Sequence, residues 1–334
     1  RGYNKDNYSI LQFSSLESIT KYGYLGVELF FIISGFVILM SAKKSNLIDF
    51  CISRFTRLYP AFWFCVLLSA SVIILFGEPI FNVTIQQILV NLTMFNGFFG
   101  VEHVDGVYWS LVIELKFYIL IGIILFFRLI KFIRIFAWLL LVVSICQIIL
   151  PYMESPYFLK VIYFLGFPDY SPYFVTGMFF FLMKTDKNII KNLLPILISY
   201  GVAIKLAFES VDRLNEKYFN AFDINIVVSI ITVFFIIMFL VCINKLNSFN
   251  KKIFLYFGVL TYPLYLIHQT IGYIIFNNLS EYINKWLLIS LLIIIMLCAS
   301  YLINKYIEKP LGNYMRTQLR NNKLLNKLKL KFIL

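Results

Sequence analysis

Long runs of apolar residues are the feature that most constrains the fold of this chain. A transmembrane helix needs about 20 mostly apolar residues to cross the hydrocarbon core of a bilayer. Nine such runs are present, near residues 24–42, 58–77, 107–127, 135–151, 170–184, 188–209, 224–244, 254–278 and 285–305. The sequence therefore predicts an all-α integral membrane protein with about nine transmembrane helices.

The composition agrees with a membrane protein and excludes other classes. Of 334 residues, 60% are hydrophobic and 14% are charged, whereas soluble domains average roughly 45–50% apolar and about 25% charged. An ordinary water-soluble enzyme is excluded, as is a disordered chain, which needs few apolar residues. The five cysteines are far apart and the two histidines form no ligand motif, so neither a disulfide framework nor a metal site is expected.

Lysine and arginine residues predict which side of the membrane each loop faces. The formal net charge is +13, from 30 Lys and Arg against 17 Asp and Glu. Loops rich in Lys and Arg lie on the cytoplasmic side, and most basic residues, among them Lys43, Arg128 and Lys245, fall in alternate loops. This pattern predicts a cytoplasmic C-terminus and an N-terminus outside. It attributes the positive charge to a membrane surface and not to nucleic acid.

Three ionisable side chains in or beside the first two predicted spans are candidate functional residues, because ionisable groups inside a span are expensive. Glu28 lies about one turn into its span, either as part of a site or as an acid at the membrane interface. Arg54 and Arg57, at i,i+3, share one helix face. Two guanidinium groups can hold phosphate groups, although a basic anchor at the cytoplasmic side has the same sequence.

A second polar group opens the run near 107–127. Ser110 and Glu114, at i,i+4, face the same way, so the pair can orient a hydroxyl or take a proton. Tyr108 and Trp109 come just before them, and Trp109 alone would be typical of the aromatic belt at a membrane interface. A structural role for these residues is as well supported by the sequence as a functional one.

The two histidines differ in their expected roles. His268 lies in a predicted span, where a single histidine is more often a helix–helix hydrogen-bond partner than a catalytic group. His103 lies in a predicted outer loop, where a solvated side chain is expected. Walker A, GxGxxG and GxSxG motifs are absent from the sequence, so ATP-driven transport and serine-hydrolase chemistry have no support.

Four blocks of sequence, taken in order, resemble one known family. They are GYLGVELFFIISGF at 23–36, RFTRLYPAFW at 54–63, YWSLVIELKFY at 108–118, and TYPLYLIHQ at 261–269 followed by YIEKP at 306–310. Together they resemble the membrane-bound acyltransferase family 3, bacterial proteins that O-acylate cell-surface sugars. Glu28 stands where the family usually has Asp, and Leu115 and Lys116 stand where it often has Glu and Gln.

The resemblance implies an O-acyltransferase that moves an acyl group, usually acetyl, from cytoplasmic acyl-CoA to a hydroxyl of a cell-surface or exported glycan. Acyl-CoA is then a co-substrate, no bound cofactor or metal is expected, and membrane lipids are the further partner. The expected location is the bacterial cytoplasmic membrane. The implied roles are catalysis by Glu114, Glu28 and Ser110, acyl-CoA binding by Arg54 and Arg57, and an acceptor pocket of Trp109, Tyr108 and His268.

The family has ten helices, and its first helix carries an Arg or Lys followed eleven positions later by a His taken to be catalytic. This sequence has no such His before Gly23. It therefore predicts that the first helix is missing and that this chain alone is inactive or nearly so. The alternatives are a non-catalytic transporter or flippase, and a degenerate family member that binds acyl-CoA or glycan without turnover.

The resemblance divides the chain into a transmembrane acyltransferase domain at 1–310 and a basic cytoplasmic tail at 311–334. The tail combines Lys and Arg with interleaved Leu and Phe. This composition is typical of a surface helix on the anionic inner leaflet, and a solvated tail is the alternative.

Overall fold

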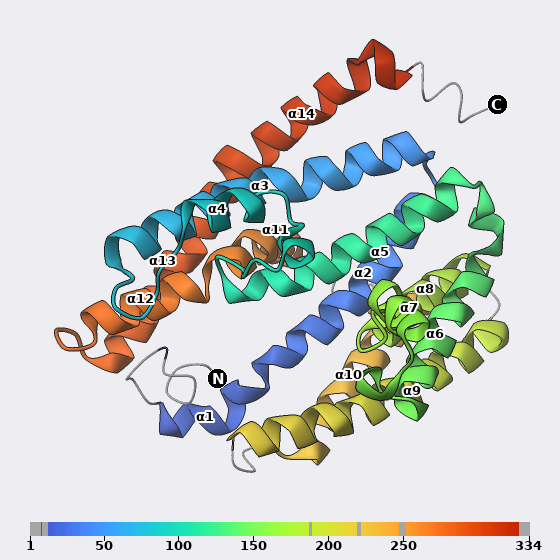
Figure 1. Ribbon diagram of the computed structural model, residues 1–334, viewed down its shortest axis with the longest axis horizontal. Helices are drawn as coiled ribbons and strands as arrows, with labels where there is room; N and C mark the ends of the chain where they lie inside the picture. The colour runs from blue at the N-terminus through green and yellow to red at the C-terminus, as the bar shows by residue number, and fades with distance from the viewer. Residues whose placement is uncertain (1–7, 9–12, 187–188, 219–221, 247–251, 327–334) are drawn as a thin grey trace. The chain divides into compact units, whose positions relative to one another are not determined.

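The computed structural model describes residues 8, 13–186, 189–218, 222–246 and 252–326. Every regular element in these ranges is a helix (Figure 1), which confirms the prediction of an all-α integral membrane protein. The chain divides into two compact units. Unit 1 comprises Arg1–Ser18, Ile48–Val112 and Lys251–Leu334, and unit 2 comprises Ile19–Leu47 and Ile113–Asn250.

Each helix except α5 lies wholly or mostly within one of the two units. Those wholly or mostly in unit 1 are α1 (Ser14–Thr20), α3 (Leu47–Phe76), α4 (Ile85–Asn91), η2 (Asn96–Phe99), η3 (Gly106–Tyr108), α11 (Lys252–Ile267), α12 (Thr270–Leu279), α13 (Lys285–Ile303), η7 (Asn304–Glu308) and α14 (Lys309–Asn321). Those in unit 2 are η1 (Lys21–Leu25), α2 (Gly26–Ala42), η4 (Leu129–Phe132), α6 (Ile133–Ile149), η5 (Tyr152–Glu154), α7 (Tyr157–Gly166), α8 (Ser171–Asp186), α9 (Ile189–Tyr218) and α10 (Ile224–Cys242). α5 (Trp109–Phe126) contributes its first residues to unit 1 and the rest to unit 2.

Fewer helices than predicted are long enough to span. Among the described residues seven are long and apolar enough to cross a membrane, and the pair α11–α12, bent by 66°, brings the number to at most eight. The described residues thus hold seven or eight of the about nine predicted spans. The run at 170–184 forms α8, which has 16 residues and so a length of only about 24 Å. The hydrocarbon core is about 30 Å thick.

The short helix α8 forms the interior of unit 2. Every residue from Ser171 to Met183 is buried, and the neighbours of α8 are α2, α6, α9 and α10. A helix covered by protein on all sides presents no face to lipid, which explains why it can be both apolar and short.

Two glycines let α8 pack directly against α2. A Cβ atom added to Gly177 would lie 2.0 Å from the carbonyl oxygen of Ile32. A Cβ atom added to Gly35 would lie 2.1 Å from the carbonyl oxygen of Phe174. Small residues at membrane helix interfaces permit this backbone contact, and the Phe174 ring then packs against Phe31 with centroids 4.8 Å apart.

Lys116 is a basic residue inside the predicted span of α5, and the fold of unit 2 satisfies its charge. Its Nζ donates to the carbonyl oxygen of Phe164 at 3.1 Å and lies 3.8 Å from the centroid of the Phe164 ring. Long basic side chains commonly reach a polar group along an apolar surface in this way. The departure from the family pattern at this position is therefore accommodated by α7.

The segment after α3 contains no helix long enough to span a membrane among its described residues. Its helix α4 has seven residues, and the fully buried Asn91 closes the segment on itself. The Asn91 amide donates to the carbonyl oxygens of Gln87 and Glu102 and accepts from the N–H of Val104. These bonds hold the segment in unit 1 as one folded loop.

α14 continues the polypeptide from α13 through the π-helical turn η7, so the predicted boundary at 310/311 falls within this helix. α14 meets α3 at Gly312, where an added Cβ would lie 2.8 Å from the carbonyl oxygen of Thr56. Arg316 Nε also donates to Thr56 Oγ1 at 3.4 Å. Part of the predicted tail is thus a helix packed on α3, and residues 327–334 lie outside the described residues.

Candidate functional site

In unit 2 the centre of the candidate site is Glu114. Its carboxylate is only 3% exposed. Ser34 Oγ of α2 and Tyr118 OH of α5 both donate to Glu114 Oε1, at 3.1 Å and 2.8 Å. A buried carboxylate needs such donors because burial removes its hydration. These bonds join the first and third sequence blocks, so Ser34 is a partner of Glu114 that the sequence did not single out.

Glu28 lies in the first turn of α2. The positive end of the helix dipole favours a carboxylate at that place. Its side chain is half-buried, and it interacts electrostatically with Tyr173 of α8. Ser34 follows about 9 Å further along the same helix. α2 thus presents a carboxylate and a hydroxyl to the interior of unit 2.

In unit 1 the break between α11 and α12 is held by Asp105. This side chain is completely buried. Its Oδ1 accepts from the N–H of Val107 at 3.1 Å and its Oδ2 accepts from the N–H of Thr270, the first residue of α12, at 3.0 Å. Burial raises the pKa of the Asp105 carboxyl above its ordinary value. Asp105 therefore fixes the start of α12 against the start of α5.

Ser110 and Tyr108 pack against the end of α11. Ser110 Oγ lies 2.7 Å from Tyr265 OH, and Tyr265 OH also donates to the carbonyl oxygen of Val107 at 2.8 Å. Tyr108, 1% exposed, donates to the carbonyl oxygen of Leu266 at 3.3 Å. Ser110 and Glu114 thus have separate hydrogen-bond partners, and the predicted catalytic role of Ser110 stays a prediction.

His268 lies at the break itself, with an exposed side chain. Its Nδ1 is 2.9 Å from the carbonyl oxygen of Tyr265. A carbonyl oxygen only accepts, so in the neutral ring Nδ1 carries the proton and Nε2 is the acceptor. Within unit 1 the structure therefore brings three predicted residues, Tyr108, Ser110 and His268, to one helix break. Trp109 is half-buried beside them.

The two predicted donor-binding arginines lie on α3 in different surroundings. Arg54 is half-buried, packs over the ring of Phe50 at 5.8 Å and donates to Ser53 Oγ at 3.2 Å. Arg57 is exposed and interacts electrostatically with Glu308. Glu308 accepts from Asn304 across the π-helical turn at 2.8 Å, so the closing YIEKP block is linked to the arginine block.

His103 is expected to make the folded loop of unit 1 sensitive to pH. Its Nδ1 accepts from the Asn96 amide at 3.0 Å, and burial lowers the His103 pKa below its ordinary value. With a lowered folded-state pKa, the stabilisation is complete above about pH 6.5 and is lost as the pH falls through the folded-state pKa. Because protonation breaks this bond, we expect about 1 kcal/mol of local destabilisation.

Amide hydrogen exchange over residues 85–105 tests this prediction. Intrinsic amide exchange slows as the pH falls, so the protection factor is the quantity to follow. It should fall about fivefold between about pH 7.5 and pH 5.5. In the His103→Asn variant the side-chain oxygen can still accept from Asn96 but does not titrate, so the protection factor should stay constant. An equal fall in this variant would assign the effect to another group.

Comparison with known proteins supports the resemblance stated above. The family model described as an acyltransferase domain matches residues 6–305, which include all the blocks at 23–36, 54–63, 108–118 and 261–269. Neither the curated proteins nor the solved structures contain a match to this chain. Because the match covers most of the chain and its helices are long and apolar enough to cross a membrane, the protein is a member of acyltransferase family 3.

Proposed function

We propose that this protein transfers an acyl group, usually acetyl, from acyl-CoA at the cytoplasmic face to a glycan hydroxyl at the outer face of a bacterial cytoplasmic membrane. The observation that carries the proposal is the buried Glu114 with its two hydroxyl donors, Ser34 and Tyr118. An acid inside a membrane helix is expensive and marks a functional site. The family membership assigns acyl transfer as the reaction class.

The reaction requires one proton to leave the acceptor. The acceptor oxygen attacks the thioester carbonyl, the new C–O bond forms, and the C–S bond breaks. A base takes the hydroxyl proton, and the CoA thiolate leaves and is protonated. Glu114 orients the base or the acceptor hydroxyl, and Glu28 adds a second carboxylate on unit 2. Trp109, Tyr108 and His268 are proposed to line the acceptor side.

Arg54 and Arg57 are proposed to bind the phosphate groups of acyl-CoA. Both lie before the uncharged stretch of α3 that begins at Leu58, on the side predicted to be cytoplasmic. Guanidinium groups bind phosphate through paired charge-assisted hydrogen bonds. The C-terminus and α14 are placed on this same side by the charge pattern.

Replacing Arg57 by alanine should weaken acyl-CoA binding about 10- to 100-fold, because a hydrogen bond to a charged group contributes about 1.5–3 kcal/mol. Binding to the purified protein in nanodiscs, measured by calorimetry, checks this result. Lys44→Ala, an exposed cation in the loop before α3, is the matched control and should bind as wild type. If Arg57→Ala binds acyl-CoA with wild-type affinity, Arg57 serves only as a basic anchor at the membrane surface.

The base is proposed to be the first-helix histidine of the family. The 334-residue chain expressed alone is then expected to bind acyl-CoA but not to transfer the acyl group. A second protein carries a family first helix, with its Arg and His, joined in front of residue 1. We call this protein the extended chain. Transfer by the 334 residues alone would assign the base to His268, whose Nε2 is an acceptor, or to His103. Binding without transfer in both proteins would favour a degenerate member.

A further inference from the structure

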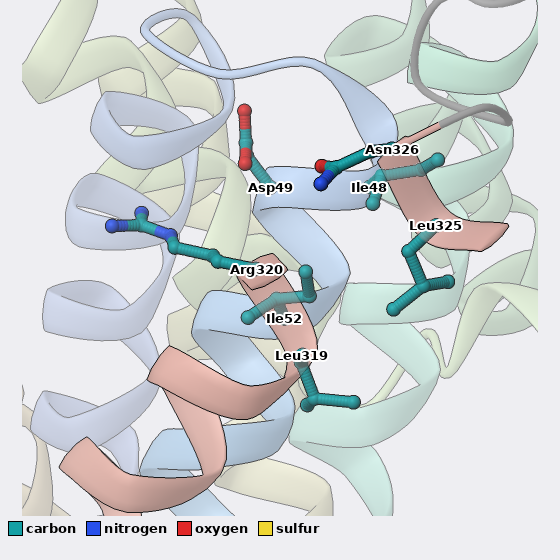
Figure 2. A pocket seen from close by; sticks show the side chains of 7 residues that line it. All are labelled: Ile48, Asp49, Ile52, Leu319, Arg320, Leu325 and Asn326. Carbon is teal, nitrogen blue, oxygen red and sulfur yellow. The ribbon is translucent and has the colours of Figure 1, made fainter. Parts of the chain in front are cut away.

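A pocket of about 250 Å³ lies between the first turns of α3 and the end of α14 (Figure 2). Three of its lining residues are polar: Asp49, Arg320 and Asn326. In Figure 2 the guanidinium of Arg320 and the carboxylate of Asp49 point to one side of α3, and Leu319 and Leu325 lie on the other. The pocket thus has a charged end and an aliphatic end.

The packing of α14 on α3 creates this pocket. The two helices run antiparallel from their contact at Gly312 and Thr56. Leu319, about two turns beyond Gly312 on α14, and Ile52, about one turn before Thr56 on α3, both line the pocket. Leu325 and Asn326, which follow α14 in the chain, also line the pocket. Ile52 is 6% exposed, so an aliphatic floor is already desolvated.

The position of the pocket along α3 favours a water-soluble ligand over a lipid. The uncharged stretch of α3 begins at Leu58, and Ile52 and Ile48 precede it by about 9 Å and 15 Å along the helix. The polar headgroup layer adds only about 5–7 Å on each side of the hydrocarbon core. With the edge of the hydrocarbon core taken at Leu58, the start of the predicted span, we infer that the pocket opens beyond the headgroups.

The chemistry of the lining fits an adenine nucleotide end. A flat base can lie between Ile48, Ile52 and Leu319, while the Asp49 carboxylate accepts from an exocyclic amino group. An asparagine amide can pair with the amino and ring nitrogen edge of adenine, and Asn326 supplies one. Arg320 supplies a guanidinium for a phosphate on the ribose. At about 250 Å³ the pocket is below the ~300–1,000 Å³ of sites for whole drug-sized ligands, so it suits one part of a longer molecule.

We propose that this pocket binds the adenosine 3′-phosphate end of the acyl-CoA donor. This inference rests on the proposed function, and it adds a nucleotide subsite formed by α14 to the arginines of α3. Arg316, bonded to Thr56, lies between the pocket and the level of Arg57 along α3. These two guanidinium groups can then take the diphosphate while the base occupies the pocket.

Binding of CoA fragments to the purified 334-residue protein in phosphatidylcholine nanodiscs tests the proposal. Wild type should bind CoA at least tenfold more tightly than dephospho-CoA, which lacks the ribose phosphate, and than phosphopantetheine, which lacks the nucleoside. Arg320→Ala should lower CoA affinity about tenfold, to the level of dephospho-CoA, and leave phosphopantetheine binding unchanged. Ile52→Trp, which fills the pocket, should lower CoA affinity by at least the same factor.

Lys323→Ala is the matched control, an exposed cation beside the pocket that does not line it, and it should bind CoA as wild type. Arg320 is exposed, so its variant keeps the test valid even if Ile52→Trp does not fold. If Arg320→Ala binds CoA as wild type does, the subsite is overturned but the proposed function is not. The same holds if this variant changes only the amount of co-purified phospholipid. If wild type binds no CoA at all, both proposals fail.

Discussion

Replacing Gly177 by alanine is expected to lower the melting temperature of the purified protein by about 10 °C. The added methyl group would lie 2.0 Å from the carbonyl oxygen of Ile32 and 2.7 Å from the amide nitrogen of Phe36. Both atoms are backbone, so α2 and α8 must separate. Overpacking costs about 1–3 kcal/mol and occasionally more, and contacts with two backbone atoms place this site at the upper end. Each kcal/mol corresponds to roughly 2–4 °C in a chain of a few hundred residues.

Thermal unfolding followed by size-exclusion fluorescence in detergent measures this effect. Gly201→Ala is the matched control, since Gly201 lies within α9 and an added Cβ meets nothing within 4 Å. That variant should be unchanged or stabilised by up to about 1 kcal/mol, because alanine is the better helix former. If Gly177→Ala has the melting temperature of wild type, the backbone contact between α2 and α8 is wrong.

Replacing Glu114 by glutamine in the extended chain should lower acyl transfer about 100- to 10,000-fold, because a base without its orienting carboxylate loses most of the rate that acid–base catalysis contributes. The glutamine oxygen can still accept from Ser34 and Tyr118, so the fold is retained. Acyl-CoA binding should stay at the wild-type level because Arg54 and Arg57 are unaltered. Initial rates with radiolabelled acetyl-CoA, together with a binding isotherm, separate these effects.

Glu102→Gln serves as the control for this second prediction, since Glu102 is an exposed acid in the loop held by Asn91. Its transfer rate should match wild type. A Glu114→Gln protein that transfers at the wild-type rate would show that Glu114 only joins α2 to α5. A Glu114→Gln protein that has lost acyl-CoA binding would contradict the assignment of the donor site to the arginines.

Much of the fold could be predicted from the sequence because apolar length and loop charge act locally. The runs at 24–42, 107–127 and 224–244 each correspond to one helix that is long enough to cross a membrane. The run at 170–184 was predicted as a span, but its helix α8 has only 16 residues. In sequence, an apolar segment enclosed by protein looks the same as one that faces lipid. Gly177 carries no local signal, since its role depends on the carbonyl oxygen of Ile32 on another helix.

For the candidate site, the sequence singled out individual residues but could not indicate their contacts. The carboxylate of Glu114 was identified, but its donors Ser34 and Tyr118 depend on how α2 packs against α5 in unit 2. Asp105 was not singled out from the sequence, although it fixes the start of α12 through Thr270. An aspartate before a Gly and a helix start is an N-cap pattern, and that signal was available in VEHVDGVYW.

The measurement that tests the proposed function most directly is acyl transfer across a membrane. Labelled acetyl-CoA is supplied to inside-out vesicles, and label is counted on a glycan acceptor enclosed within them. We expect label on the enclosed glycan with the extended chain, little or none with the 334-residue chain, and none with the Glu114→Gln variant of the extended chain. Equal transfer by the 334-residue chain would contradict the role of the first-helix histidine. No transfer by the extended chain, although it binds acyl-CoA, would contradict acyl transfer itself.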